Sequence, residues 1–297
     1  MEQPGTPRLN VGVIGVGKAG SVLGAALRRA GHPVVGVYAV SDLSLVRAEA
    51  LLPGAPVVSM QEVFAGSDLV LLTVPDDVLG ELVESFAREG WIRPGQFLVH
   101  CSGRYGTGVL DPATAAGALP LALHPVMTLT GTSLDLDRLS GCPFGVTAPE
   151  SLLTVASALV VEMGGEPMVV AEDKRALYHA ALAYSANHMI TLASDAMQLL
   201  SAAGVGTPEL MLRPLLSASL DNALERGDAA LTGPVSRGDA TTVSRHLVEL
   251  SQESEQLAEV YRTLARRTAE RALAAGTLSP DDAQRLLAVL AGPAGST

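Results

Sequence analysis

Two polar residues that could act in catalysis lie on one face of a long apolar helix predicted near the middle of the chain. His179 and Asn187 are joined through Ala183 along one ridge of i, i+4 neighbours. When a carbonyl or imine accepts a hydride, a histidine can donate a proton near neutral pH, and an amide such as Asn187 could orient the substrate oxygen. A hydrogen-bonded core histidine is the alternative for His179, and spacing alone favours it.

A second polar group follows in the segment Leu-Thr-Gly-Pro-Val-Ser-Arg-Gly-Asp, residues 231–239, which leads into another predicted helix. Asp239 is expected to be the N-cap of that helix, with Thr242 at its third position. Arg237 beside the helix start could bind a carboxylate, because its planar guanidinium matches two oxygens. A solvated surface arginine fits the sequence equally well.

A glycine-rich turn dominates the start of the chain. Residues 11–24 read as a buried strand, a G-x-G-x-x-G turn and a helix. Gly15 would permit the tight turn, Gly17 would let the backbone approach a pyrophosphate, and Gly20 would let the helix pack close to the strand. Lys18 adds a positive charge near the expected phosphates of an otherwise acidic protein. We therefore predict dinucleotide contacts at Gly15, Val16, Gly17, Lys18, Ala19 and Gly20.

The tip of the next strand bears on the choice of dinucleotide. After the strand of residues 34–40, Ser41 with Arg47 could receive the 2′-phosphate of NADP, whereas Asp42 could hold the free ribose of NAD. Asp42 could instead cap the helix of residues 43–52. The sequence favours NADP (NADPH) as the cofactor.

Two later strands should end beside the glycine-rich turn. The strand of residues 68–75 ends in a proline, and that of residues 96–101 runs into Ser102 and Gly103. Small residues there would let a nicotinamide ring and a substrate approach closely. Because open parallel sheets bind ligands outside the carboxyl ends of their strands, we predict further cofactor contacts. These are Val74, Pro75, Cys101 and Ser102.

Other polar residues at strand ends have two readings. His124 closes the strand of residues 117–124, and it either faces a ligand or fixes the turn before Pro125. Asp76 and Asp77 are expected to cap the helix that runs on to Ala87.

The order of these elements predicts a Rossmann-type, doubly wound, mostly parallel α/β sheet in residues 8–171, followed by an all-α domain in residues 172–297. Helices are expected at about 173–203, 208–226, 240–275 and 280–291. The first of these carries many alanines, so neighbouring backbones can approach it closely. We expect it to be wrapped by the other helices or by a second subunit, which suggests a homodimer through the helical domain.

Composition limits the classes of partner. The chain has 297 residues, of which 48% are hydrophobic and 17% charged, which fits two well-buried domains. A formal net charge of −11 disfavours nucleic acid and anionic membranes as partners and leaves a small-molecule substrate. Two cysteines form neither a disulfide framework nor a metal cluster, so no metal site is predicted. Without the pattern of a signal peptide, a cytoplasmic location is expected.

Several segments together resemble a known family. They are His100-Cys-Ser-Gly103, His124-Pro-Val126, Tyr178-His-Ala-Ala181, Ser185-Ala-Asn-His188 and the segment of residues 231–239. The set resembles Rossmann-like proteins with a C-terminal helical domain long described as of unknown function, often labelled F420-dependent NADP oxidoreductase-like. This resemblance covers about residues 9–267. The family includes a second kind of ketopantoate reductase, and its relatives in fold are pyrroline-5-carboxylate reductase, 6-phosphogluconate dehydrogenase and the 3-hydroxyisobutyrate dehydrogenases.

The resemblance implies an NADPH-dependent reductase of a small 2-oxo acid, with ketopantoate as the first candidate. It favours as catalytic residues His179, Asn187, Arg237, Asp239, Ser102 and His124. The hydroxyacid dehydrogenase relatives use a catalytic lysine on the equivalent helix, whereas here only Lys174 is near, at the helix start. Imine reduction of the pyrroline-5-carboxylate type and a non-catalytic, NADP-binding regulatory protein are the alternatives.

Overall fold

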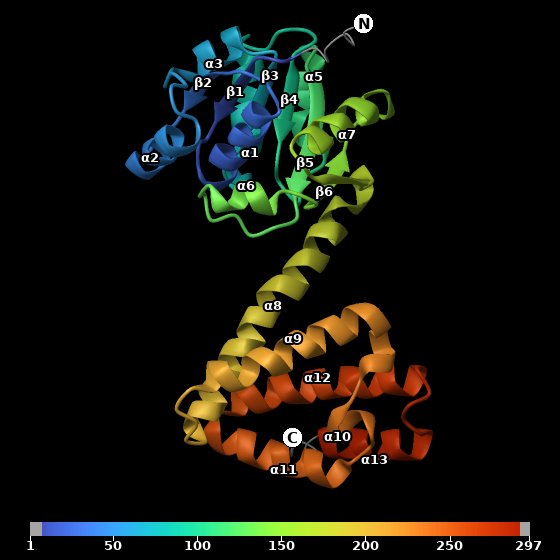
Figure 1. Cartoon of the computed structure of the whole chain (residues 1–297). Helices are drawn as coiled ribbons and strands as arrows, with labels where there is room; N and C mark the ends of the chain where they lie inside the picture. Colours follow the sequence, from blue (N-terminus) through green and yellow to red (C-terminus); the bar gives the residue numbers. More distant parts are fainter. Residues whose placement is uncertain (1–7, 292–297) are drawn as a thin grey trace, which may run out of the picture. The chain divides into compact units, whose positions relative to one another are not determined.

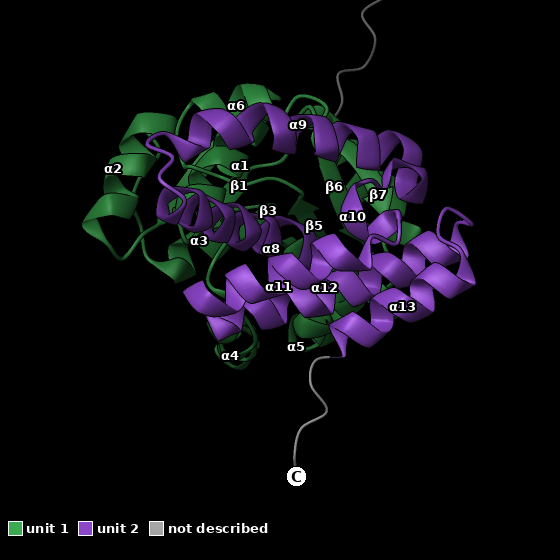
Figure 2. Cartoon of the chain, turned by 90° about the horizontal axis from the view of Figure 1, so that it is seen from below, with its two compact units in different colours: residues 1–183 green, residues 184–297 purple. Residues whose placement is uncertain are grey.

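The computed structural model describes residues 8–291, and contacts divide the chain into two compact units, Met1–Ala183 and Tyr184–Thr297 (Figure 2). Helix α8 (Arg175–Ala202) begins in unit 1 and ends in unit 2. The domain boundary predicted at residue 172 lies at the short 3-10 helix η3 (Glu172–Lys174), before the division between the two units, and stays a prediction. The last six residues of the predicted helical domain, 292–297, lie outside the described residues.

Unit 1 is built on a seven-stranded sheet (Figure 1). Its strands are β1 (Val11–Ile14), β2 (Val34–Tyr38), β3 (Leu69–Leu72), β4 (Phe97–His100), β5 (Leu119–Pro125), β6 (Pro143–Thr147) and β7 (Glu166–Val169). They lie in the order β2-β1-β3-β4-β5-β6-β7, and all neighbours are parallel except β5 and β6. The predicted mostly parallel, Rossmann-type sheet is therefore confirmed.

Helices cover both faces of this sheet. They are α1 (Lys18–Arg29), α2 (Asp42–Leu51), α3 (Met60–Gly66), α4 (Asp76–Arg88), α5 (Asp111–Ala115), α6 (Leu134–Arg138) and α7 (Leu153–Glu162), with the 3-10 helices η1 (Thr107–Leu110) and η2 (Glu150–Leu152). One buried cluster joins α1 and α7 to the sheet through Leu23, Leu27 and Leu159. The other joins α3 and α4 to the opposite face through Phe64, Val83 and Phe86. Burial on both faces explains why β1 and β3 are apolar without alternation.

Strand register brings the predicted site residues to one edge. Ile14 pairs with Leu72, Leu72 with His100, and His100 with Ala122. The residues that follow these strands therefore emerge side by side at the carboxyl edge of the sheet. Neighbouring strands are about 4.8 Å apart, so the chain leaving β4 emerges about 10 Å from the glycine-rich turn after β1.

Unit 2 contains α9 (Pro208–Arg226), the 3-10 helix η4 (Gly227–Ala230), α10 (Gly233–Ser236), α11 (Ala240–Glu253), α12 (Glu255–Ala274) and α13 (Pro280–Leu290). A buried cluster including Val243, Ala269 and Leu286 holds α11, α12 and α13 together. None of the helices between residues 8 and 291 combines the length and the apolar character needed to cross a membrane.

One helix prediction was wrong. The segment predicted as a single helix, residues 240–275, forms two helices interrupted at Ser254. The Ser254 backbone is extended, with φ −165° and ψ 121°, and its hydroxyl accepts a hydrogen bond from the Leu257 amide. A serine that satisfies the next helix start favours a break over continuation.

Candidate functional site

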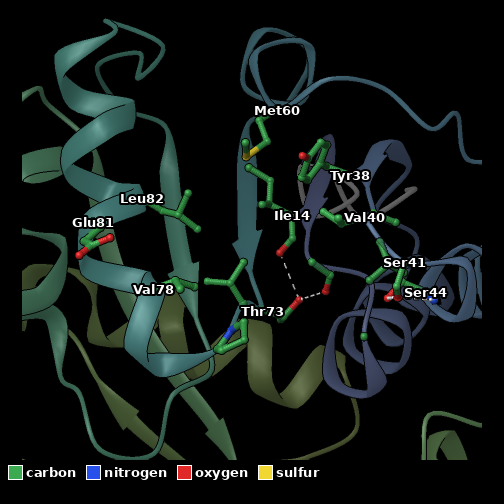
Figure 3. Close-up of a pocket in the computed structure, with 16 residues that line it drawn as sticks. Ile14, Tyr38, Val40, Ser41, Ser44, Met60, Thr73, Val78, Glu81 and Leu82 are labelled. Carbon is green, nitrogen blue, oxygen red and sulfur yellow. Dashed lines mark hydrogen bonds between the residues drawn. The ribbon is translucent and has the colours of Figure 1, made fainter.

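A cavity of about 940 Å³ opens at the carboxyl ends of β1, β2 and β3 (Figure 3). Six residues predicted to contact the cofactor line it, namely Gly15, Val16, Gly17, Ser41, Val74 and Pro75. Lys18, Ala19 and Gly20 form the first turn of α1, and Cys101 and Ser102 follow β4; none of these five lines the cavity. Some of the residues predicted to bind the cofactor therefore line this cavity. A role in cofactor binding stays a prediction for the whole set.

The three glycines of the turn differ in why the fold needs them. Gly15 has φ +92°, and an added Cβ would lie 2.8 Å from the Thr73 carbonyl oxygen. A Cβ at Gly20 would overlap the Gly15 carbonyl oxygen and the Thr73 hydroxyl, which confirms its role in close helix packing. Beyond the two chain neighbours, a Cβ at Gly17 would meet no atom of residues 8–291 within 4 Å, and the backbone there is extended, with φ −76° and ψ −155°. The described residues give no steric reason for glycine at position 17.

Thr73 ties β3 to the glycine-rich turn. Its hydroxyl donates to the carbonyl oxygens of Gly15 and Ile14, as Figure 3 shows. Across the cavity, Val78, Glu81 and Leu82 project from α4, and this side is mainly apolar.

Two hydroxyls face the cavity from the start of α2. Ser41 is the N-cap of α2 and accepts from the Ser44 amide at 3.2 Å, and the two hydroxyl oxygens are 2.9 Å apart. The alternative reading of Asp42 as the cap does not hold, because Asp42 already lies in the first turn, where its charge favours the helix dipole. The predicted capping by Asp76 and Asp77 was wrong, because both follow the N-cap position occupied by Pro75.

The loop after β5 lies against the Arg47 side chain and the backbone of Lys18. An added Cβ at Gly131, which has φ +81°, would lie 2.8 Å from Arg47 Nε and 3.1 Å from Lys18 Cα. Buried Asp135 holds this loop by accepting from the amides of Thr130 and Gly131 at 2.7 and 2.8 Å. Gly131 in this loop therefore lies beside both the Arg47 side chain and the start of α1.

A second group of residues gathers where β4 and β5 end. His124 Nδ1 lies 2.8 Å from the Tyr178 hydroxyl, and the rings of His124 and His179 meet edge-on with centroids 6.4 Å apart. An added Cβ at Gly103 would lie 2.7 Å from His179 Cδ2 and 2.9 Å from His124 Nε2. Gly103, expected to make room for a nicotinamide, thus makes room for two imidazole rings of the protein. Two of the predicted catalytic residues, His124 and His179, are therefore neighbours.

The loop carrying Ser102 is held by residues that sequence reasoning missed. Buried His100 accepts from the Ser102 amide at its Nδ1 and donates from Nε2 to the Gly106 carbonyl at 2.8 Å. On the other side, the Glu172 carboxylate accepts from the amides of Thr107 and Gly108 at 2.7 and 3.1 Å. The only sequence signal was the resemblance, whose first segment begins at His100.

Arg175 fixes the start of α8, and it too was missed. It is 2% exposed, and its guanidinium donates to the Thr147 hydroxyl and to the carbonyl oxygens of Ala122 and Gly145, at 2.8–2.9 Å. Its charge also lies 5.5 Å from the centre of the Tyr178 ring. The first turns of α8, which carry His179, are therefore anchored to β5 and β6.

Burial and nearby cations keep two histidines neutral. Burial, then the charge of Arg175, lowers the pKa of His124 to about 4. Burial also lowers the pKa of His100 to about 4, against an opposing hydrogen bond to the Gly106 carbonyl. Both rings are thus uncharged at neutral pH.

These shifts predict acid sensitivity. Between pH 6.5 and 4 the unfolded chain binds more protons at these rings than the folded chain, so stability is lost as pH falls. The loss is on the order of 3 kcal/mol for buried His100 and smaller for half-buried His124. Urea unfolding at pH 7 and pH 4.5 measures it, and His124→Gln should lose less stability than wild type. His188→Gln, on an exposed part of α8, is the control; equal losses in all three proteins would contradict the prediction.

The remaining predicted residues belong to unit 2. Asp239 is the N-cap of α11 as predicted, accepting from the Thr242 amide at 3.0 Å and its hydroxyl at 2.7 Å. These bonds, together with the nearby charge of Arg237, lower the pKa of Asp239. Asn187 and Arg237 are exposed. Convergence of these three residues with His179 on one substrate stays a prediction.

Two family models match the chain. One, described as a Rossmann-like domain, matches residues 2–125, and the other, described as a domain of unknown function (DUF2520), matches residues 142–268. No curated protein matches the sequence.

Solved structures share the fold over nearly the whole chain. Protein TM1727 from Thermotoga maritima is 22% identical, with 90% of this chain and 99% of that one covered and a TM-score of 0.68. The reductive aminase from Aspergillus terreus in complex with NADPH and ethyl levulinate is 17% identical, with 95% and 99% covered and a TM-score of 0.64. The pyrroline carboxylate reductase of Plasmodium falciparum with NADP bound is 11% identical, with 90% and 100% covered and a TM-score of 0.57.

At these identities the structural similarity shows the fold alone. The two family models are more specific, since they follow each other along the chain and together span most of it. The chain therefore carries a Rossmann-like domain followed by a DUF2520 domain.

Proposed function

We propose that the protein is an NADP-dependent oxidoreductase that reduces a small 2-oxo acid. The observation that carries the proposal is Gly17, where no described residue beyond its two chain neighbours has an atom within 4 Å of an added Cβ, while a cavity of about 940 Å³ opens beside it. A glycine without a steric reason in the protein is explained by the close approach of a pyrophosphate to the start of α1. The bound NADP and NADPH of two similar structures support the same cofactor class.

The cavity offers groups that suit this cofactor. Nicotinamide supplies the hydride when the cofactor is bound. The Ser41 and Ser44 hydroxyls, with Arg47 one turn further along α2, would hold the 2′-phosphate that distinguishes NADPH from NADH. Lys18 would face the pyrophosphate, which both dinucleotides carry.

Cofactor preference gives a testable contrast. Arg47→Gln is expected to raise the Kd for NADPH at least tenfold and to leave the Kd for NADH unchanged, because a charge-assisted bond to phosphate is worth about 1.5–3 kcal/mol. Lys18→Gln should weaken both dinucleotides to a similar degree. Fluorescence titration of each variant with both cofactors measures this, and an equal effect of Arg47→Gln on both would contradict the assignment.

Ketopantoate is the first candidate substrate. In this proposal Arg237 binds the substrate carboxylate, Asn187 holds the carbonyl oxygen and His179 donates the proton to it. Asp239, as the N-cap of α11, fixes the end of the loop that carries Arg237. Ser102 and His124 lie next to Gly103 at the end of β4 and β5, where the nicotinamide would meet the substrate.

Imine reduction is the second candidate. The similarity in fold to a pyrroline carboxylate reductase and to a reductive aminase favours it. The same groups would then act on a carbon–nitrogen double bond, with His179 as the proton donor.

One assay tests these proposals. Purified protein is mixed with NADPH or NADH and offered ketopantoate, other 2-oxo acids and pyrroline-5-carboxylate, while absorbance follows cofactor oxidation. Oxidation of NADPH by a 2-oxo acid supports the first proposal, and oxidation by the cyclic imine supports the second. Binding of NADPH without oxidation by any substrate would favour a regulatory protein, and unchanged turnover in His179→Ala would exclude His179 as the proton donor.

We also propose a homodimer through the helices of unit 2. Arg175 is the only buried residue of α8, and one residue, Leu212, is buried in α9. Large apolar side chains are exposed along both helices: Leu177, Tyr184, Met189, Ile190, Leu192, Leu210, Met211, Leu215, Leu216, Leu220 and Leu224. Monomers rarely leave such a surface uncovered, and a stable dimer buries about 800 Å² of each partner. A second copy of the chain would cover the alanine-rich helix that the sequence predicted to be wrapped.

The dimer prediction is checked by sedimentation at micromolar concentration. We expect wild type to be a dimer and Ile190→Asp to shift towards monomer, because a charge would be buried at the interface. Leu134→Asp changes a similarly exposed residue in unit 1 and should leave the dimer intact. A monomeric wild-type protein would refute the proposal.

A further inference from the structure

The ring of His124 is held by a phenol contributed by α8. The Tyr178 hydroxyl lies 2.8 Å from His124 Nδ1, and the two rings meet edge-on with centroids 5.7 Å apart. The two residues are 54 positions apart in the sequence. They meet because Arg175 anchors the first turn of α8, which carries Tyr178, to β5 and β6. The pair is therefore built into the junction of β5 and α8.

The surroundings of Tyr178 fix the direction of this hydrogen bond. Burial raises the pKa of Tyr178, against the opposing effects of the Arg175 charge and of the Gly145 backbone, so the hydroxyl keeps its hydrogen at neutral pH. This half-buried O–H needs an acceptor for its hydrogen. His124 Nδ1 is the acceptor found among the described residues. A neutral ring that accepts at Nδ1 carries its hydrogen at Nε2.

Nε2 of His124 faces the end of β4. It lies 2.9 Å from the position of an added Cβ at Gly103, beside His179, and no hydrogen-bond partner for it is found within residues 8–291. The charged and titratable groups that act on the ring are Arg175, His179 and His100, and each disfavours a positive charge there. The arrangement thus presents an N–H donor from an uncharged ring.

We infer that Tyr178 is a positioning residue that holds His124 in the Nε2–H form, so that His124 donates a hydrogen bond to an acceptor oxygen of the substrate. This inference rests on the proposed reductase function and gives His124 a role distinct from proton transfer. A carbonyl oxygen accepts such a bond. A protonated imine carries its own N–H and would oppose it, so the site selects a ketone over an iminium ion.

The first test uses nuclear magnetic resonance and needs no substrate. In protein labelled with ¹⁵N-histidine, long-range ¹H–¹⁵N spectra distinguish the two neutral tautomers, and His124→Gln identifies the His124 signals among the six histidines. We expect Nε2 to carry the hydrogen in wild type, and Tyr178→Phe to give a mixture of tautomers. Tyr261→Phe removes the other tyrosine–histidine pair, 2.9 Å from His246 Nδ1, and should leave the His124 signals unchanged. A hydrogen on Nδ1 in wild type, or an unchanged tautomer in Tyr178→Phe, would overturn the inference.

The second test measures turnover. Tyr178→Phe should lower kcat/KM for the 2-oxo acid about tenfold, the effect of weakening one hydrogen bond in the transition state, while the Kd for NADPH stays the same. Selectivity for the ketone over pyrroline-5-carboxylate should fall with it. An equal loss on both substrates would overturn the substrate preference. If the expected tautomer is found but no substrate is reduced, the proposed function fails while the positioning of His124 stands.

Discussion

Gly17→Ala is expected to weaken NADPH binding at least tenfold, about 1.4 kcal/mol, without loss of stability. Among residues 8–291 the added methyl group would meet no atom within 4 Å beyond its chain neighbours, and the backbone is extended and not left-handed, so we expect the folded state to tolerate the change. The same methyl group would stand where a pyrophosphate approaches the amides at the start of α1. Isothermal titration with NADPH and urea unfolding measure the two effects separately.

Two other glycines provide the contrast. Gly20→Ala should destabilise the protein by about 1–3 kcal/mol, because its Cβ would overlap the Gly15 carbonyl oxygen and the Thr73 hydroxyl. Gly206→Ala in unit 2 also adds a Cβ into open space and should change neither stability nor binding. Wild-type NADPH affinity in Gly17→Ala would remove the main support for the proposed function.

Arg175→Met is expected to destabilise unit 1 by about 3 kcal/mol. The change leaves the Ala122 and Gly145 carbonyls and the Thr147 hydroxyl without their buried donor, and each unsatisfied buried group costs about 1–3 kcal/mol. Because the start of α8 would lose its anchor to β5 and β6, the positions of Tyr178 and His179 should loosen as well. Urea unfolding monitored by far-UV circular dichroism measures the stability change.

The matched control is Arg262→Met. Arg262 forms ion pairs with Glu255 and Glu259, whose side chains are 68% and 59% exposed, so its loss should cost less than about 1 kcal/mol. A second readout is the pKa of His124, which should rise in Arg175→Met because that charge contributes, after burial, to keeping it low. Equal destabilisation by the two variants would contradict the anchoring role of Arg175.

Local features of the fold were predictable because they depend on residues close in sequence. The glycine-rich turn after β1 and the Asp239 cap of α11 are each set within one or two turns of chain. The cap of α2 is Ser41 and not Asp42, the alternative that the sequence left open, since both are good cap residues and only the backbone at the end of β2 decides between them.

The sequence by itself determined the alternation of strands and helices, the sheet type and the edge at which the site residues emerge, because burial on both faces of a parallel sheet dictates long apolar runs. Only the tertiary structure decided which residues meet there. The contact between His124 and Tyr178 and the burial of Arg175 depend on how the start of α8 packs against the antiparallel pair β5 and β6. The same packing explains why residue 103 is a glycine, since the imidazole rings of His124 and His179 lie where its side chain would be.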